Sequence, residues 1–272
     1  MPELPEVETV RRRLEPLMRG RTLTRVDILD PRLLQPAAPS DIARELTGRQ
    51  VAAVERRGKY LRIRFEHGVS ALHHLRMTGS FAAPGAPLPA HVRLRYFLDD
   101  AAEPIVYNDP RRFGTLHVDS DEQIDAYLDA RLGPEPLSDE WTAAVLRRAL
   151  TSRTAPIKAA LLDQRVVAGL GNIYVDEACF LAGIRPDRPA NSIGAVRLER
   201  LVSAVKARLR EAIDVGGSTL RDYRGVEGTA GGMQERFVAY GRAGKPCLTC
   251  GATMRGLRIA GRSTSYCPRC QR

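Results

Sequence analysis

The sequence lacks any apolar run close to the ~18 residues that a membrane-spanning helix requires. Its first ten residues are rich in acidic side chains and have no apolar core, so they do not resemble a secretory signal. We therefore expect a cytoplasmic protein with no membrane contact. Acidic residues are also the minority charge, with 32 Asp and Glu against 42 Lys and Arg and a net charge of +10. This excess favours a polyanionic partner such as nucleic acid, although a merely soluble basic protein would show it too.

Cysteine is scarce until the end of the chain. Of five cysteines, four lie in the last 26 residues as two C-x-x-C pairs: Cys247 with Cys250, and Cys267 with Cys270, separated by sixteen residues. In a reducing compartment this spacing indicates one tetrahedral zinc ion rather than disulfides. Four thiolates leave no open coordination position, so the zinc is expected to be structural and to replace a missing core. Cys179 stands alone and is interpreted as a core residue.

Basic side chains lie on the segment between and beside the two cysteine pairs, at Arg255, Arg258, Arg262 and Arg269. A basic hairpin of this kind can lie along a phosphate backbone. A zinc ribbon with a solvated basic face, used for protein binding, has the same composition. The ribbon alone does not separate these two interpretations.

The first half of the chain is predicted to be one helix followed by strands. Val7, Val10, Leu14 and Leu17 recur at helical spacing over residues 2–20, and Gly20 suits a helix end. Alternation with period two follows, and it is clearest over residues 61–66 and 92–98. A loop rich in Pro and Ala occupies residues 82–89. The strand spacing over residues 22–118 is typical of an antiparallel sandwich or barrel.

The second half is predicted to be helical. A Pro-rich hinge at residues 132–138 ends the strand-rich part, and helical spacing then covers residues 139–151, 156–167 and 195–214. Gly216 and Gly217 end the last of these helices, and residues 217–235 are interpreted as a Gly-rich mobile loop. A length of 272 residues with 43% hydrophobic content fits two modest domains.

The N-terminus carries a candidate nucleophile. Removal of the initiator Met would expose the secondary amine of Pro2, whose pKa is expected in the α-amino range of about 7.7–8.0. A partly neutral amine can attack an electrophilic carbon and form a cationic imine with an opened sugar. Glu3, beside it, is a candidate proton donor, whereas Glu6 and Glu8 fit a helix first turn, where carboxylates favour the helix dipole.

The ordered motifs of the chain resemble formamidopyrimidine-DNA glycosylases from residue 1 to residue 272. Both ends contribute, with Met1-Pro-Glu-Leu-Pro-Glu-Val-Glu8 at the start and the zinc module at the end. The intermediate motifs are Arg57-Gly-Lys-Tyr60, His74-Leu-Arg-Met-Thr-Gly79, Asp109-Pro-Arg-Arg-Phe-Gly114, Gly169-Leu-Gly-Asn-Ile-Tyr174 and Gly261-Arg-Ser-Thr-Ser-Tyr-Cys267.

The resemblance implies an α+β protein. An N-terminal helix and an antiparallel β-sandwich would form a catalytic domain over residues 1–131. A helical DNA-binding domain over residues 132–236 would contain a helix-two-turns-helix element and a lesion-capping loop at 217–235, and a four-cysteine zinc finger would follow over residues 237–272. The implied activity is bifunctional: excision of 8-oxoguanine and formamidopyrimidines from double-stranded DNA, then β,δ-elimination at the abasic site. The protein would act as a monomer with one structural zinc ion.

The resemblance also assigns catalytic residues. Pro2 would attack the sugar C1′, Glu3 would assist base loss and sugar opening, and Lys59 would serve the elimination step. A strand lysine beside a polyanion can equally be a phosphate contact. Arg262 would grip phosphates and serve the second elimination.

Three further residues would fill the space that a flipped nucleotide leaves in the duplex. Met77 would act as an apolar wedge, Phe113 would stack on bases, and Arg111 would bond the orphaned base. Ordinary strand packing is the alternative for Met77 and Phe113.

Phosphate contacts are implied at four other positions. Gly169-Leu-Gly-Asn172 resembles the family's turn, in which backbone amides and Asn172 approach a phosphate. A plain Gly-rich helix end is the alternative. Lys158 matches a family lysine near the lesion phosphate, and Arg153 and His91 match DNA-contact positions. A solvated histidine beside a loop is the alternative for His91, and His74 is a weaker match.

Two rival functions share these features. An enzyme like endonuclease VIII has the same architecture but prefers oxidised pyrimidines, and Leu4, where those relatives carry glycine, argues against it. A non-catalytic zinc-ribbon DNA-binding protein would retain Met1. The loop from Arg221 to Met233 is Gly-rich, as in the family, but the sequence near its end departs from the family's usual motif. Because this loop caps the flipped base in the family, the departure concerns substrate preference.

Overall fold

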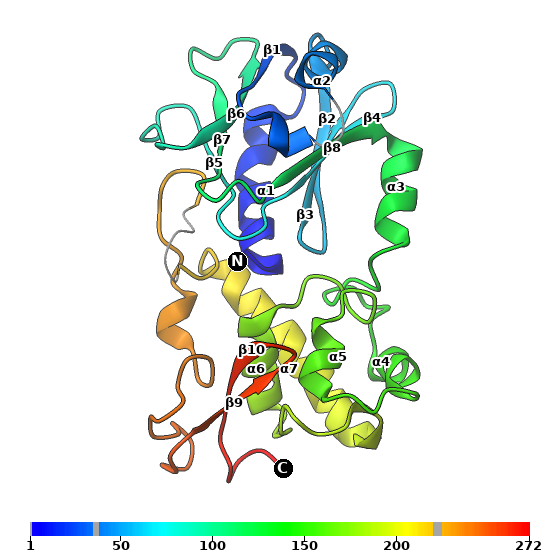
Figure 1. Ribbon diagram of the computed structural model, residues 1–272, viewed down its shortest axis with the longest axis vertical. Coiled ribbons are helices and arrows are strands. Elements are labelled where there is room, and N and C mark those ends of the chain that lie inside the picture. The colour runs from blue at the N-terminus through cyan, green and yellow to red at the C-terminus, as the bar shows by residue number, and fades with distance from the viewer. Residues whose placement is uncertain (1, 35–37, 220–224) are drawn as a thin grey trace. The chain divides into compact units, whose positions relative to one another are not determined.

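The computed structural model describes residues 2–34, 38–219 and 225–272, and the chain divides into two compact units (Figure 1). The first unit runs to Ala130 and also includes Val215–Gly232. The second comprises Arg131–Asp214 and Met233–Arg272. Among the described residues, every helix is too short or too polar to span a bilayer.

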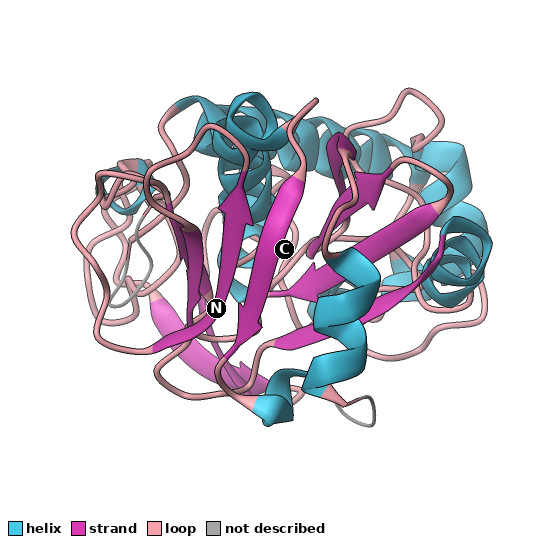
Figure 2. Ribbon diagram, turned by 90° about the horizontal axis from the view of Figure 1, so that it is seen from above, coloured by secondary structure: helices cyan, strands magenta, loops and turns pink. Residues whose placement is uncertain are grey.

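The first unit is a β-sandwich with a helix in its core. One four-stranded sheet has the order β1-β6-β7-β5 and the other β2-β3-β4-β8, and all neighbours are antiparallel. Figure 2 draws the strands in magenta. The strands are β1 (Leu23–Ile28), β2 (Val51–Arg57), β3 (Tyr60–Phe65), β4 (Val69–His74), β5 (Ser80–Ala82), β6 (Val92–Leu98), β7 (Ile105–Asn108) and β8 (Thr115–Ser120). This confirms the sandwich and the strands expected near residues 61–66 and 92–98.

Helix α1 (Leu4–Met18) packs against β2 and β3. Val7, Val10, Leu14 and Met18 are fully buried in the same apolar cluster as the inner faces of the sheets. The helix begins with Pro5 in its first turn, which suits proline because its missing N–H has no partner to lose there. The unit also contains α2 (Pro39–Leu46), α3 (Asp121–Asp129) and a short 3₁₀ turn, η1 (Pro31–Leu34).

The second unit is mainly helical. It contains α4 (Ala143–Leu150), α5 (Ile157–Leu162), α6 (Asn172–Leu181) and α7 (Ala195–Asp214), the 3₁₀ turns η2 (Ala190–Ser192) and η3 (Met233–Arg236), and the hairpin β9 (Arg255–Ile259) and β10 (Arg262–Tyr266). The helices expected in 139–151, 156–167 and 195–214 are confirmed, the first two in shorter form. Apolar periodicity did not predict helix α6, because its residues 173–180 are buried all round and the helix has no solvated polar face.

The two units differ from the three-part division expected from the sequence. The sequence-based division assigns residues 215–232 to the helical domain, but in the structure they belong to the first unit. In that unit the Ser218 N–H donates to Glu6, and the Ala83 N–H donates to the Val226 carbonyl. The zinc ribbon belongs to the second unit, where the carboxylate of Glu177 accepts the N–H groups of residues 238–240. The finer division into three domains stays a prediction. Part of the expected loop at 217–235, residues 220–224, lies outside the described residues.

Candidate active site and metal centre

Pro2 and Glu3 are both buried at the start of α1. Glu3 is the N-cap residue, and it forms a capping box with Glu6. Its N–H donates to Glu6 Oε2 at 2.8 Å, while its own carboxylate accepts the N–H of Glu6. This reciprocal pair fixes the backbone at the chain's start. Pro2 and the buried carboxyl of Glu3 are therefore held at a capped helix end.

Lys59 lies in the tight turn between β2 and β3, after Gly58 with φ of 58°. It is 6% exposed. The turn is tied to α1 through Arg56, which donates to Glu8 Oε2 at 3.1 Å and to the Gly58 carbonyl at 3.1 Å. Burial acts to raise the pKa of Glu8, but hydrogen bonds from Arg11 and Arg12 and the charge of Arg56 hold it below its usual value. Ionised Glu8 therefore binds Arg56 and holds the turn that carries Lys59 against α1. The interpretation of Glu8 as a helix-dipole residue did not indicate this contact.

His74 is opposite Tyr60 in the β3–β4 ladder and packs edge-on against its ring. Burial, reinforced by the positive charges of Arg76 and Lys59, lowers the pKa of His74 to about 3. Its Nδ1 accepts the Arg76 N–H at 3.0 Å. His74 is therefore neutral near neutral pH, and its ring nitrogen bonds the backbone of the turn that leads to Met77.

Glu6 also reaches across the first unit to the segment after α7. Its Oε1 accepts the N–H of Ser218 at 2.8 Å and the Ser218 hydroxyl at 3.0 Å. Gly217, with φ of +81°, places its backbone so close that an added β-carbon would lie 3.0 Å from Glu6 Cγ and Oε1. One carboxylate therefore joins the N-terminal pair to the base of the Gly-rich segment.

A substitution at Gly217 tests this junction. We expect Gly217→Ala to lower the free energy of unfolding by about 1–2 kcal/mol from the left-handed backbone alone, and to slow base excision further because Ser218 is pushed away from Glu6. Gly20→Ala is the matched control, since Gly20 has φ of +77° but nothing within 4 Å of the added carbon. Urea unfolding and single-turnover excision should separate the two variants. Equal excision rates in both would contradict a role for the contact.

Met77, Arg111 and Phe113 project from two loops of the first unit. Met77 is 40% exposed and Phe113 53% exposed, so strand packing does not account for either. The Arg111 guanidinium lies over the Phe113 ring, 4.7 Å from its centroid. Exposed apolar side chains beside a stacked arginine are suited to insertion between bases. His91 is exposed at the start of β6, and its N–H donates to Asn108.

The second unit holds the other basic candidates. Arg153 is partly exposed and donates to Asp163 Oδ2 at 3.1 Å. Arg262 is exposed at the beginning of β10, directly after the hairpin turn at Ala260 and Gly261, where both φ values are positive. Such turns match the twist of a two-stranded ribbon. The arginine is therefore presented at the tip of the hairpin.

Lys158 occupies a different place from the one expected. Its side chain is 0% exposed, and its amine donates to Asp176 Oδ1 at 2.7 Å and to the Ser263 carbonyl at 2.9 Å. The Asn172 amide donates to the same carbonyl at 3.0 Å. In this structure the Lys158 amine has no surface left for a phosphate contact. It holds the zinc hairpin against α5 and α6, beside Asn172.

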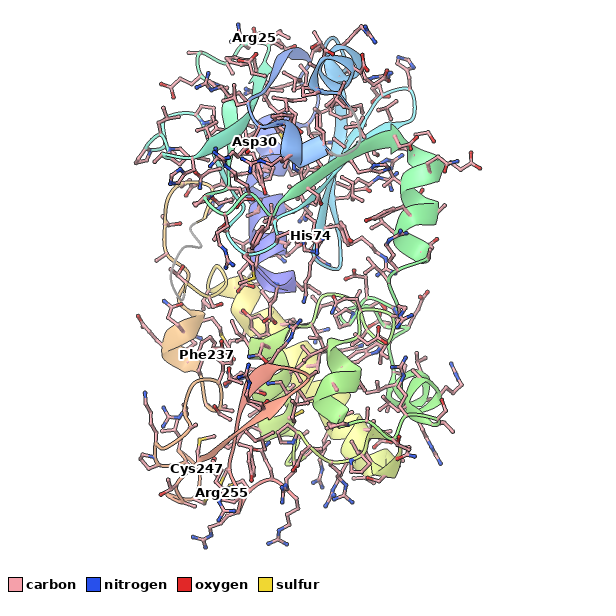
Figure 3. All side chains as sticks on the ribbon, in the orientation of Figure 1. Arg25, Asp30, His74, Phe237, Cys247 and Arg255 are labelled. Carbon is pink, nitrogen blue, oxygen red and sulfur yellow. The ribbon has the colours of Figure 1, made fainter. Side chains whose placement is uncertain are left out.

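The four cysteines of the ribbon form a metal-binding cluster. Their Sγ atoms all lie within 4.8 Å of one another, with 3.9 Å between Cys247 and Cys270 and 3.5 Å between Cys250 and Cys267. Figure 3 labels Cys247. A tetrahedral zinc ion with 2.3 Å bonds requires sulfur spacings of about 3.8 Å. The cluster therefore fits one zinc ion. The fifth cysteine, Cys179, is fully buried in α6, as expected.

Three family models cover most of the chain: the formamidopyrimidine-DNA glycosylase N-terminal domain at residues 1–116, the formamidopyrimidine-DNA glycosylase H2TH domain at 132–224, and a zinc finger found in FPG and IleRS at 244–272. The chain is 45% identical over 276 residues to formamidopyrimidine-DNA glycosylase of Geobacillus kaustophilus, with all of both chains covered. It is 48% identical over 285 residues to that of Rhodospirillum rubrum, also over the full length of both.

Solved structures of formamidopyrimidine-DNA glycosylases are also similar to this chain. The MutM (Fpg) protein from Thermus thermophilus matches with a TM-score of 0.88 and 43% identity, covering 99% of this chain and 98% of that one. Lactococcus lactis Fpg in complex with DNA containing an abasic site matches with a TM-score of 0.90 and 38% identity, covering 99% of both chains. A Lactococcus lactis variant bound to DNA containing Fapy-dG matches with a TM-score of 0.91 and 37% identity, covering 100% of both. With the same three modules in the same order over its whole length, the chain belongs to the formamidopyrimidine-DNA glycosylase family.

Proposed function

We propose that this protein is a bifunctional DNA glycosylase and abasic-site lyase that removes 8-oxoguanine and formamidopyrimidines from double-stranded DNA. The observation that carries the proposal is the buried Pro2-Glu3 pair on the capped end of α1. It is supported by relatives whose structures hold DNA with Fapy-dG or with an abasic site. The protein would act as a monomer in the bacterial cytoplasm, on damaged duplex DNA.

The reaction begins with the lesion out of the base stack, because no side chain reaches C1′ within a duplex. Met77, Arg111 and Phe113 would occupy the vacated space. The neutral amine of Pro2 attacks C1′, and the C1′–N bond to the base breaks as Glu3 delivers a proton. The Pro2 nitrogen then returns its proton to Glu3, which passes it to O4′ as the C1′–O4′ bond breaks, and the Pro2 nitrogen and C1′ are left joined as a cationic imine.

Strand cleavage follows from that cation. The imine acidifies C2′, so loss of a C2′ proton expels the 3′ phosphate, and a second elimination expels the 5′ phosphate. Lys59 would serve the first elimination, and the guanidinium of Arg262, which stays protonated, would hold the leaving phosphates and serve the second. Hydrolysis of the remaining imine frees Pro2.

Phosphate binding would come mainly from the second unit. Arg153, Asn172 and the exposed Arg262 are on its surface or at its hairpin tip, and His91 contributes from the first unit. Lys158 would act indirectly, since its buried amine sets the position of the Ser263 carbonyl beside Arg262. The zinc ion would hold the ribbon that carries Arg262 and take no part in the reaction.

Borohydride trapping on matched duplexes tests the proposal. We expect a covalent adduct with 8-oxoguanine opposite cytosine that forms at least about tenfold faster than with thymine glycol. Glu3→Gln should lower base excision by about 10²–10⁴-fold, the usual contribution of a general acid, yet still be trapped on a preformed abasic site. Faster trapping on thymine glycol would favour the endonuclease VIII-like alternative. Duplex binding without any trapping would favour the non-catalytic one.

A further inference from the structure

Two loops of the first unit, residues 75–79 between β4 and β5 and residues 109–114 between β7 and β8, are joined by a buried polar contact. The Thr78 hydroxyl donates to Asp109 Oδ1. Thr78 is 6% exposed and Asp109 1% exposed, so water does not compete for the bond. A hydrogen bond to a buried carboxylate is among the stronger ones in proteins.

The same two side chains also organise the second loop. Asp109 Oδ2 accepts the Gly114 N–H at 2.7 Å, and Thr78 Oγ1 accepts the Arg111 N–H at 3.2 Å. Both carboxylate oxygens of Asp109 and the single hydroxyl of Thr78 are therefore used. Each loop supplies the partners that the other loop needs.

Tyr107 packs against both loops. It is fully buried, and a β-carbon on Gly79 would lie 2.3 Å from its Oη, while one on Gly114 would lie 1.8 Å away. Both distances are far below van der Waals contact. The last residue of each loop therefore has to be glycine, and both loops are packed onto the same phenol ring.

A second contact shapes the loop between Asp109 and Gly114. Arg112 adopts a left-handed backbone with φ of 58°, and its Nε lies 3.4 Å from Asp30 Oδ2 (Figure 3 labels Asp30). A positive φ is costly for a side chain of this size. Its neighbours Arg111 and Phe113 are thereby left on the outside of the loop, exposed and stacked on each other.

We propose that Thr78 and Asp109 are positioning residues that couple the two loops, so that Met77, Arg111 and Phe113 enter the duplex as one rigid body. The inference rests on the proposed function, because it concerns the residues that fill the space left by the lesion. Filling that space takes three side chains from two separate loops at once. Loops locked to each other lose less conformational freedom on insertion than two independent loops.

Removal of the Thr78 hydroxyl is the primary test. Thr78→Val keeps the shape and removes the bond, whereas Thr78→Ser keeps the hydroxyl. We expect Thr78→Val to slow single-turnover excision of 8-oxoguanine by about tenfold, the scale of one hydrogen bond to a charged group, with duplex affinity within about threefold. A 2-aminopurine beside the lesion should show a smaller and slower fluorescence rise. Thr78→Ser should restore both signals, and Thr24→Val, on the outer face of β1, is the matched control.

A double-mutant cycle makes the coupling itself measurable. The effects of Met77→Ala and Phe113→Ala on the excision rate should be non-additive in the native background. In the Thr78→Val background they should be additive, because the two loops are then no longer joined. The inference is overturned if the coupling energy between Met77 and Phe113 is the same in both backgrounds, or if Thr78→Ser excises the base as slowly as Thr78→Val. It is also overturned if the loss only follows a lower folded fraction, measured by thermal unfolding. If the native protein excises no base at all, the proposed function fails instead.

Discussion

Protein that retains Met1 is expected to lose base excision and borohydride trapping by at least about 10³-fold, the order seen when a catalytic nucleophile is removed. In that form the Pro2 nitrogen belongs to a peptide bond, and its lone pair is delocalised into the carbonyl. The carboxylates of Glu3 and Glu6 cannot replace this amine as a nucleophile, and they are engaged with each other's backbone and with Ser218. The measurement is single-turnover excision and trapping with the two forms separated by intact mass.

The control uses the same chain. Treatment of the Met1-retaining protein with methionine aminopeptidase should restore activity in proportion to the Met removed, since nothing else changes. Peptide mapping of the reduced adduct should then find the sugar on residue 2. An adduct on Lys59, or equal trapping before and after treatment, would refute the assignment of Pro2.

Loss of the zinc ion is expected to have the second largest effect. Cys267→Ser should remove the metal and weaken binding to a lesion duplex by at least about 100-fold. The apolar cluster around the cysteines is small: within the described part of the chain its buried members are Phe180, Ala239 and Met254, together with Cys247 and Cys267. Without the metal the hairpin has too little core to hold Arg262 at its tip. Zinc content by mass spectrometry and fluorescence anisotropy of a labelled duplex are the measurements.

Cys179→Ala is the matched variant. Cys179 is as buried as Cys267 but lies in α6, outside the cluster. We expect it to keep one zinc ion per chain and to bind the duplex as the native protein does, with a modest loss of stability from the small cavity. A Cys267→Ser protein that still held one zinc ion and bound DNA normally would exclude the structural role of the metal.

Features that depend on neighbours in the chain were predictable. The cysteine spacing indicated the zinc cluster, because two short turns place four thiolates together whatever the rest of the protein does. Helix α1 and the strands near residues 61–66 and 92–98 followed from their apolar periodicity. The unpredicted helix α6 shows the limit of that signal, since a helix buried all round has no polar face to reveal its period.

Roles that depend on distant partners were not predictable. The sequence indicated a helix-dipole role for Glu6 and Glu8, but Glu6 bonds Ser218, 212 residues away, and Glu8 bonds Arg56. Lys158 was expected at a phosphate, yet it is fully buried and donates to Ser263, 105 residues away. No spacing in the sequence indicates which of several lysines will be enclosed.

By itself the sequence determined the family, the order of its modules, the metal-binding cysteines and the candidate nucleophile, because each is written in contiguous residues or short spacings. The tertiary structure alone decided that Met77 and Phe113 are exposed, that Lys158 is buried and that the Thr78 hydroxyl donates to Asp109. The physical reason is that the environment of a polar or apolar side chain is set by which surfaces the folded chain brings together. Burial and long-range pairing are properties of that packing and not of local sequence.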